Sequence, residues 1–160
     1  MSDRREARLL LAILREDWDD AEALARERAP DPGRFSALCK GCDVHPAVHA
    51  ILERELRFGL VGEAIREDLA RLRHKVRMDN LLLLARLEHT LDVLASAGVV
   101  PVVLKGVDVV HRFGIPFDAR TLDDVDFLVD PRDIGRVLAA LEGAGFVAPS
   151  GEARLHWLRS

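Results

Sequence analysis

The chain of 160 residues lacks several features that mark particular classes of protein. It has only two cysteines, Cys39 and Cys42, so it is not a disulfide scaffold, and a cytoplasmic setting is the default expectation. No apolar run is long enough to span a bilayer, and the first six residues do not form a signal peptide. The sequence also contains no internal repeat and no low-complexity segment.

An excess of basic charge is missing as well. The formal net charge is −4 and the pI is about 5.9. A general nucleic-acid-binding protein usually presents a basic face, so we expect no such binding. With 49% hydrophobic and 31% charged residues, the composition is that of an ordinary globular protein. The length suits one domain, or one domain with a helical extension.

The first 97 residues have the hydrophobic pattern of helices. Apolar residues recur at helical spacing from 9 to 25 and along a leucine-rich segment from 63 to 97. Breakers at 30–33 separate the first helix from a shorter one, and Pro46 is well placed to open another. Gly98 suits the position after the last helix. We therefore predict a helical N-terminal region over residues 1–97.

The pattern changes at residue 98 to one typical of alternating strands and helices. The β-branched run 99–104 predicts a buried strand. The elements expected after it are a turn at Lys105-Gly106, a helix over 107–113, a strand over 122–129, a helix over 132–144 capped by Asp130, and a hairpin reaching 155–158. The prediction is an α+β fold, in which residues 98–160 form a small mixed sheet flanked by helices.

Two carboxylates, Asp124 and Asp126, lie two residues apart within the second predicted strand. Alternate side chains of a strand point to the same face, and their Cα atoms are about 6.5 Å apart. Carboxylates beside a core are costly unless something pairs with them, and a divalent cation is the simplest partner. Oxygen ligands favour Mg²⁺. The alternative is a pair of solvated residues at a strand end, because short Asp-x-Asp strings are common.

These aspartates belong to a longer pattern that resembles the nucleotidyltransferase fold superfamily. The pattern is Leu104-Lys105-Gly106, then Arg120, then Asp124-Val125-Asp126-Phe127-Leu128-Val129. It is most similar to the bacterial uncharacterised nucleotidyltransferase family, in which a helix ending in Leu-x-x-x-Gly-aromatic follows. Here that ending spans Leu141 to Phe146. The motifs cover roughly residues 98–147.

The resemblance implies transfer of a nucleoside monophosphate from a nucleoside triphosphate to a hydroxyl of an acceptor. The acceptor, a small molecule or a protein, is not identified by the sequence. Because charge builds on phosphate oxygens in such reactions, the protein supplies metal ions and fixed cations. Asp124 and Asp126 are then the catalytic Mg²⁺ ligands. Lys105, Gly106 and Arg120 bind the triphosphate, Gly106 through free backbone N–H groups at a strand-to-helix turn.

The sequence departs from the family pattern in two places. Gly106 is followed by Val107, where many nucleotidyltransferases have Gly-Ser or Gly-Gly. A third carboxylate is expected on a later strand, and after residue 146 the only acidic residue is Glu152. We therefore predict an incomplete core with Glu152 as the third metal ligand. The alternative function is a catalytically deficient, nucleotidyltransferase-like binding module that acts through a protein partner.

A second group of ligand-type residues reads Cys39-x₂-Cys42-x₂-His45-x₃-His49. These side chains suit tetrahedral zinc. The gap between the second cysteine and the first histidine is much shorter than in zinc fingers. The alternative to a zinc site is a joint between two helices.

Overall fold

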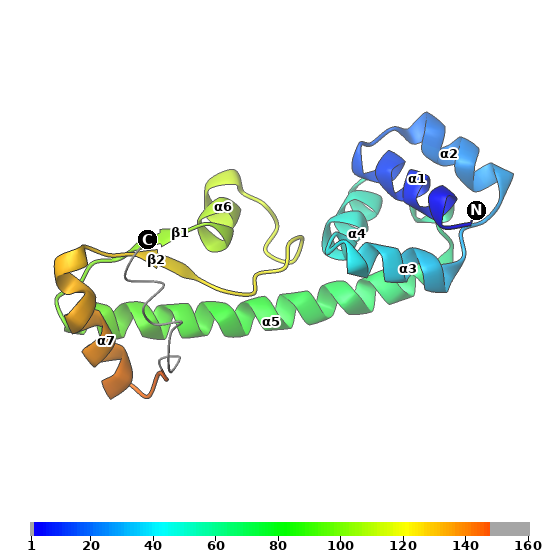
Figure 1. Cartoon of the computed structure of the whole chain (residues 1–160). Helices are drawn as coiled ribbons and strands as arrows, with labels where there is room; N and C mark the ends of the chain where they lie inside the picture. Colours follow the sequence, from blue (N-terminus) through cyan, green and yellow to red (C-terminus); the bar gives the residue numbers. More distant parts are fainter. Residues whose placement is uncertain (1, 148–160) are drawn as a thin grey trace. The chain divides into compact units, whose positions relative to one another are not determined.

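The structure, a computed structural model, describes residues 2–147 (Figure 1). Its helices are α1 (Ser2–Leu14), α2 (Trp18–Glu27), α3 (Pro32–Gly41), α4 (His45–Arg54), α5 (Glu63–Ser96), α6 (Gly106–Phe113) and α7 (Ile134–Gly143). Short 3₁₀ turns span Phe58–Leu60 and Pro131–Asp133, and the strands are β1 (Val102–Leu104) and β2 (Asp126–Leu128). The predicted α+β class is confirmed. None of the described helices is both long and apolar enough to cross a membrane.

The chain forms two compact units. We call Met1–Leu81 with Val110–Asp123 the helical unit, and Leu82–Val109 with Asp124–Ser160 the sheet unit. Helix changes to strand near residue 98, where the hydrophobic pattern changes. As a domain boundary, residue 98 stays a prediction.

The core of the helical unit is made by α1 to α4 and the start of α5. The fully buried apolar side chains of this core are Leu9, Ile13, Ala21, Phe35, Cys39, Val48, Leu52, Ile65 and Leu69. Two of the helices begin at aspartate caps, since Asp17 accepts from Asp20 N and Asp31 accepts from Arg34 N. This cluster gives the unit a closed hydrophobic core.

The single helix predicted across residues 9–25 is wrong. The chain leaves α1 after Leu14, Glu16 adopts a left-handed conformation with φ +57°, and Asp17 then caps α2. The apolar spacing continues through this break because both helices face the same core, so periodicity alone could not locate it.

The long helix predicted for residues 63–97 is confirmed as α5. It ends where Gly98 takes a φ of +70° and Val99 N donates to Leu94 O at 2.9 Å. A residue without a side chain accepts this left-handed conformation at low cost.

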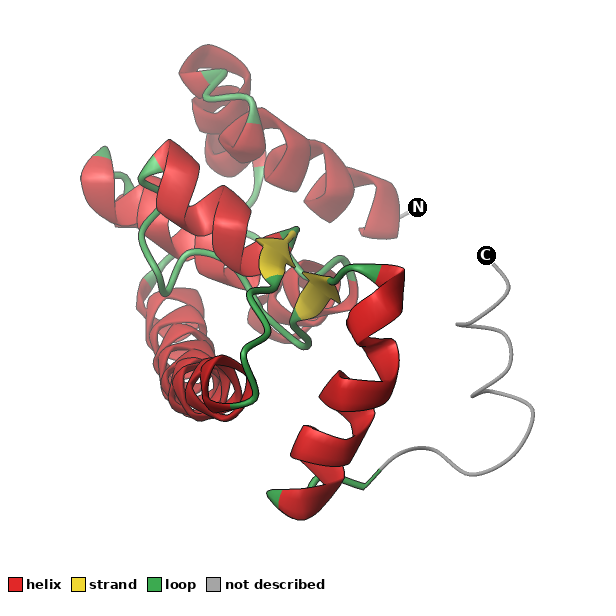
Figure 2. Ribbon diagram, turned by 90° about the vertical axis from the view of Figure 1, so that its left-hand side faces the viewer, coloured by secondary structure: helices red, strands yellow, loops and turns green. Residues whose placement is uncertain are grey.

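The strands of the sheet unit pair antiparallel in the register Val102↔Leu128, Val103↔Phe127 and Leu104↔Asp126 (Figure 2). In the residues that the structure describes, the sheet is this one antiparallel pair, not the mixed sheet that we expected. Both strands are three residues long, shorter than predicted. The second strand of the predicted hairpin, 155–158, lies outside the described residues.

The prediction that β1 is a buried strand is wrong for one of its faces. Val102 is 52% exposed, and Leu128, its partner across the sheet, is 59% exposed. The other face is better covered: Phe127 lines a small cavity together with Leu87 of α5 and Leu141 of α7. In the described part of the chain, one face of the two-stranded sheet is therefore open to solvent, and β1 is not buried on both faces.

Candidate functional site

The sheet register brings the predicted phosphate-binding lysine to one of the predicted metal ligands. Asp126 is the partner of Leu104, the residue before Lys105. Lys105 leaves β1 with a φ of +54°, a conformation uncommon for a residue with a side chain. Its Nζ lies 2.9 Å from Asp126 Oδ2. The turn that ends β1 therefore places the ammonium group over the neighbouring strand.

The two partners of this ion pair differ in exposure. The Lys105 side chain is 75% exposed and that of Asp126 is 17% exposed. Asp126 Oδ2 is buried and has no well-aligned hydrogen bond within the described residues, so the contact is an ion pair. Buried polar atoms in native proteins are nearly always hydrogen-bonded, so such an atom calls for an explanation.

Asp124 lies outside the strand, because β2 begins at Asp126. Strand alternation therefore does not fix the direction of its side chain, and the expected common strand face is wrong in this detail. Its charge still acts at the site. The pKa of Lys105 is raised, first by the close contact with Asp126 and last by the charge of Asp124. The structure thus brings Lys105 to Asp126, and Asp124 acts on Lys105 through its charge.

Gly106 is the first residue of α6, as the predicted strand-to-helix turn requires. The first backbone N–H groups of a helix have no partner within it. Val109 N, the first to bond back into the turn, donates to Lys105 O at 2.8 Å. The same first turn carries an acidic residue, Asp108.

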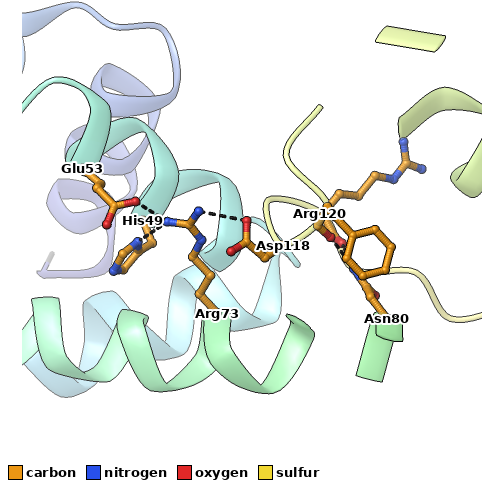
Figure 3. A network of polar contacts seen from close by, with 7 residues as sticks. His49, Glu53, Arg73, Asn80, Asp118 and Arg120 are labelled. Carbon is orange, nitrogen blue, oxygen red and sulfur yellow. Dashed lines mark hydrogen bonds and ion pairs between the residues drawn. The ribbon is translucent and has the colours of Figure 1, made fainter. Parts of the chain in front are cut away.

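Arg120 belongs to the helical unit. Its backbone oxygen accepts a hydrogen bond from Asn80 Nδ2 at 2.9 Å. Its side chain is exposed, and in the described part of the chain its guanidinium makes no ion pair or hydrogen bond. Figure 3 shows this guanidinium directed away from the neighbouring polar network. The triphosphate contact expected of Arg120 stays a prediction.

The third predicted metal ligand, Glu152, lies outside the described residues. Within residues 2–147, no group of three or more His, Cys, Asp or Glu side chains is arranged to hold a metal ion. The described part of the aspartate site therefore contributes two carboxylates.

In the described residues, Cys39, Cys42, His45 and His49 are likewise not arranged as a metal site. Cys39 is buried in α3, and burial raises the pKa of its thiol to about 12. Burial also lowers the pKa values of His45 and His49. The segment is the helix–helix joint of the alternative reading, with Asp43 at a φ of +54°.

The sequence reasoning missed a polar network around Arg73 (Figure 3). Arg73 Nη1 donates to His49 Nδ1 at 3.0 Å and to Glu53, and Nη2 donates to Asp118 Oδ1 at 2.9 Å. Its side chain is only 17% exposed, so this charged residue does not lie on a solvated face of α5. A signal was present: Arg73 follows the buried Leu69 by four residues, on the same helix face.

Asn80 was also missed, although its position gave the same kind of signal. It lies four residues after the buried Val76 and is itself fully buried. Its Nδ2 donates to Phe117 O at 2.7 Å and to Arg120 O at 2.9 Å, and its Oδ1 accepts from Leu122 N at 3.1 Å. One side chain thereby fixes the loop that follows α6.

The motif and this geometry indicate a relationship to the nucleotidyltransferases, and a comparison with protein families tests it. The model of the family described as "uncharacterised nucleotidyltransferase" matches residues 28–158, more than half of the chain. The chain belongs to the uncharacterised nucleotidyltransferase family. The match begins well before the motif region at 98–147 and so includes much of the helical part. No curated protein and no solved structure matches the chain.

Membership confirms the prediction of a transferase of phosphorus-containing groups. It implies a nucleotide substrate, and nucleotidyltransferases generally use a divalent metal.

Proposed function

We propose that this nucleotidyltransferase uses Mg²⁺ and a nucleoside triphosphate, and moves the nucleoside monophosphate to a hydroxyl of an acceptor. In this reaction the acceptor oxygen forms a bond to the α-phosphorus while the bond to pyrophosphate breaks. The observation that carries the proposal is the contact between Lys105 and Asp126 beside Asp124 and the first turn of α6. These groups are of the kind that hold a metal–triphosphate complex.

The donor atoms suit a magnesium ion. Asp126 Oδ2 is a buried oxygen without a hydrogen bond in the described part, and a cation, the Lys105 ammonium, already lies beside it. Mg²⁺ prefers oxygen ligands and commonly takes only one or two carboxylates together with substrate phosphates. Asp124 and Asp126 would hold it, with Glu152 as the proposed third ligand. When bound, Mg²⁺ offsets the negative charge of the triphosphate.

The remaining residues of the proposal bind and orient the triphosphate. The exposed Lys105 ammonium can leave Asp126 and pair with phosphate oxygens, because a side chain that is 75% exposed is not held by packing. Gly106 offers the backbone N–H groups at the start of α6. Val107 supplies no hydroxyl, so we assign the phosphate contacts of this turn to the backbone.

A second candidate is a catalytically deficient binding module that acts through a protein partner. It is favoured by one observation of the sequence: after residue 146, Glu152 is the only acidic residue that could supply a third carboxylate. This reading predicts a folded protein without transfer activity whose helical unit binds a protein.

Calorimetric titration of each nucleoside triphosphate, first with Mg²⁺ and then with EDTA, separates the two candidates. We expect one nucleotide to bind only with Mg²⁺, and this binding to be lost in Asp124→Asn/Asp126→Asn. Asp92→Asn, which removes an exposed carboxylate of α5 in the same unit, is the matched control. Glu152→Gln tests the third ligand. Failure of the folded wild-type protein to bind any nucleotide would contradict the proposal and leave the binding module.

A further inference from the structure

The helical unit contains a groove of about 600 Å³ that nucleotidyl transfer does not explain. Helix α4 forms one wall and the loop after α6 forms the other. Much of the lining is apolar, including Ala47, Ala50 and Ile51 from α4 and Ile115 and Ala119 from the loop. Its volume lies within the range of small-molecule sites, which are concave, mostly apolar and supplied with a few polar groups.

The loop wall of the groove is held in place although it has no regular secondary structure. Asn80 makes three hydrogen bonds to the backbone of residues 117–122. Asp118 pairs with Arg73 at 2.9 Å, and Thr121 Oγ1 donates to Asp43 Oδ1 at 2.8 Å. A wall fixed in this way costs little to order on binding, which is a property of preformed ligand sites.

The charges around the groove show what kind of ligand it would accept. Glu53 is paired with Arg73, and Arg54 is paired with Glu16 and Glu55. The Asp43 carboxylate, at the end of the groove's α4 wall, accepts a hydrogen bond from Thr121. Arg120 also lines the groove, and its guanidinium has no partner in the residues that the structure describes. A guanidinium suits the two oxygens of a carboxylate, sulfonate or phosphate group.

We propose that this groove binds a small ligand with an apolar body and one anionic group, the body lying between α4 and the loop and the anion on Arg120. The site goes beyond nucleotidyl transfer and does not depend on it. It stands on groups of the helical unit alone.

The test uses two fluorescent probes of similar size. One is 8-anilinonaphthalene-1-sulfonate, which has an aromatic body and one sulfonate, and the other is N-phenyl-1-naphthylamine, which lacks the sulfonate. We expect the sulfonate probe to bind the folded protein at one site. Arg120→Gln should weaken it about tenfold and leave the neutral probe unchanged. Arg77→Gln, which removes an exposed arginine of α5 outside the groove, should change neither.

A second variant tests the apolar wall. Ala50→Leu places a larger side chain in the groove and should weaken both probes about tenfold. Circular dichroism and thermal unfolding confirm that each variant is folded. Unchanged affinity of the sulfonate probe in Arg120→Gln or in Ala50→Leu would overturn the proposal. If Arg120→Gln weakened Mg²⁺–nucleotide binding and left the sulfonate probe unaffected, Arg120 would serve the triphosphate, and the groove proposal would fail while the proposed function stood.

Discussion

Each unit of the molecule contains a carboxylate paired with a cation, and the two pairs are built differently. In the helical unit, Asp118 pairs with Arg73, and both side chains are mostly buried, at 22% and 17% exposed. In the sheet unit, Asp126 pairs with Lys105, whose side chain is 75% exposed. Arg73 also contacts His49 and Glu53, whereas Asp126 Oδ2 lacks a hydrogen bond in the described residues.

The difference separates a structural ion pair from one that can exchange partners. Removing either member of a buried, hydrogen-bonded pair leaves an uncompensated charge, so the Arg73 pair is expected to be essential to its unit. An exposed lysine can leave its partner without disturbing the packing, and the buried Asp126 carboxylate then requires another cation. The sheet unit can therefore offer Asp126 to a metal ion and Lys105 to a phosphate, while the helical unit holds its loop still.

The largest effect on stability is expected from Asn80→Ala. The change removes three hydrogen bonds and leaves two carbonyl groups and one N–H of the loop unsatisfied. The free energy of unfolding should fall by about 3 kcal/mol. Urea denaturation measures it, with Arg77→Ala on the exposed face of α5 as the control. A loss below about 1 kcal/mol would mean that Asn80 does not anchor the loop.

The comparison of the two ion pairs is tested next by Asp118→Asn and Asp126→Asn. Asp118→Asn should lower the free energy of unfolding by about 2 kcal/mol, because Arg73 loses a buried partner, and should leave nucleotide binding intact. Asp126→Asn should weaken Mg²⁺-dependent nucleotide binding at least about 30-fold and change stability by less than about 1 kcal/mol. Calorimetry and urea denaturation give both quantities. The same pattern of losses in both variants would refute the distinction between the pairs.

Lys105→Gln should have a smaller effect, confined to ligand binding. We expect nucleotide affinity to fall about tenfold, because a charged phosphate contact is lost, and thermal unfolding to stay unchanged. Lys75→Gln, at an exposed position of α5, is the matched control. Equal affinity of Lys105→Gln and the wild type would exclude a phosphate contact at Lys105.

The smallest effect concerns pH. Burial lowers the pKa values of His45 and His49 in the folded chain, and unfolded histidine titrates near about 6.5. The unfolded chain therefore binds protons first as the pH falls. The stability from the neutral histidines is complete above about pH 6.5 and is lost as the pH falls through the lower folded values.

Urea denaturation between pH 7.5 and pH 5 measures this loss. The slope should flatten in His45→Gln/His49→Gln and persist in His74→Gln, which changes an exposed histidine of α5. A slope that is the same in the double variant and the wild type would contradict the assignment.

The sequence allowed the elements with local causes to be predicted. The long helix up to Gly98 follows from spacing and a cap, and the Lys105-Gly106 turn follows from residue type. The lengths of β1 and β2 could not be predicted from the sequence, because a strand extends only as far as a partner pairs with it. The loop fixed by Asn80 was missed, since its contacts lie 37 to 42 residues away along the chain.

The candidate site could also be predicted only in part, because some of its contacts are with residues distant in the chain. The motif placed Lys105 and Asp126 in one site, and the register of two short strands brings them within 2.9 Å. The direction of Asp124 could not be predicted, because it depends on where β2 begins. The partners of Arg73 were equally hidden, since Asp118 lies 45 residues along the chain.

The most direct test of the central claim, that the sheet unit holds the nucleotide, is paramagnetic NMR with Mn²⁺ in place of Mg²⁺. A chain of 17.8 kDa is within the size range of amide NMR spectroscopy. With the nucleotide that binds in calorimetry, we predict selective broadening of the amide signals of residues 105–107 and 124–127, absent in Asp126→Asn. Broadening centred elsewhere in the chain, with these signals unaffected, would contradict the account.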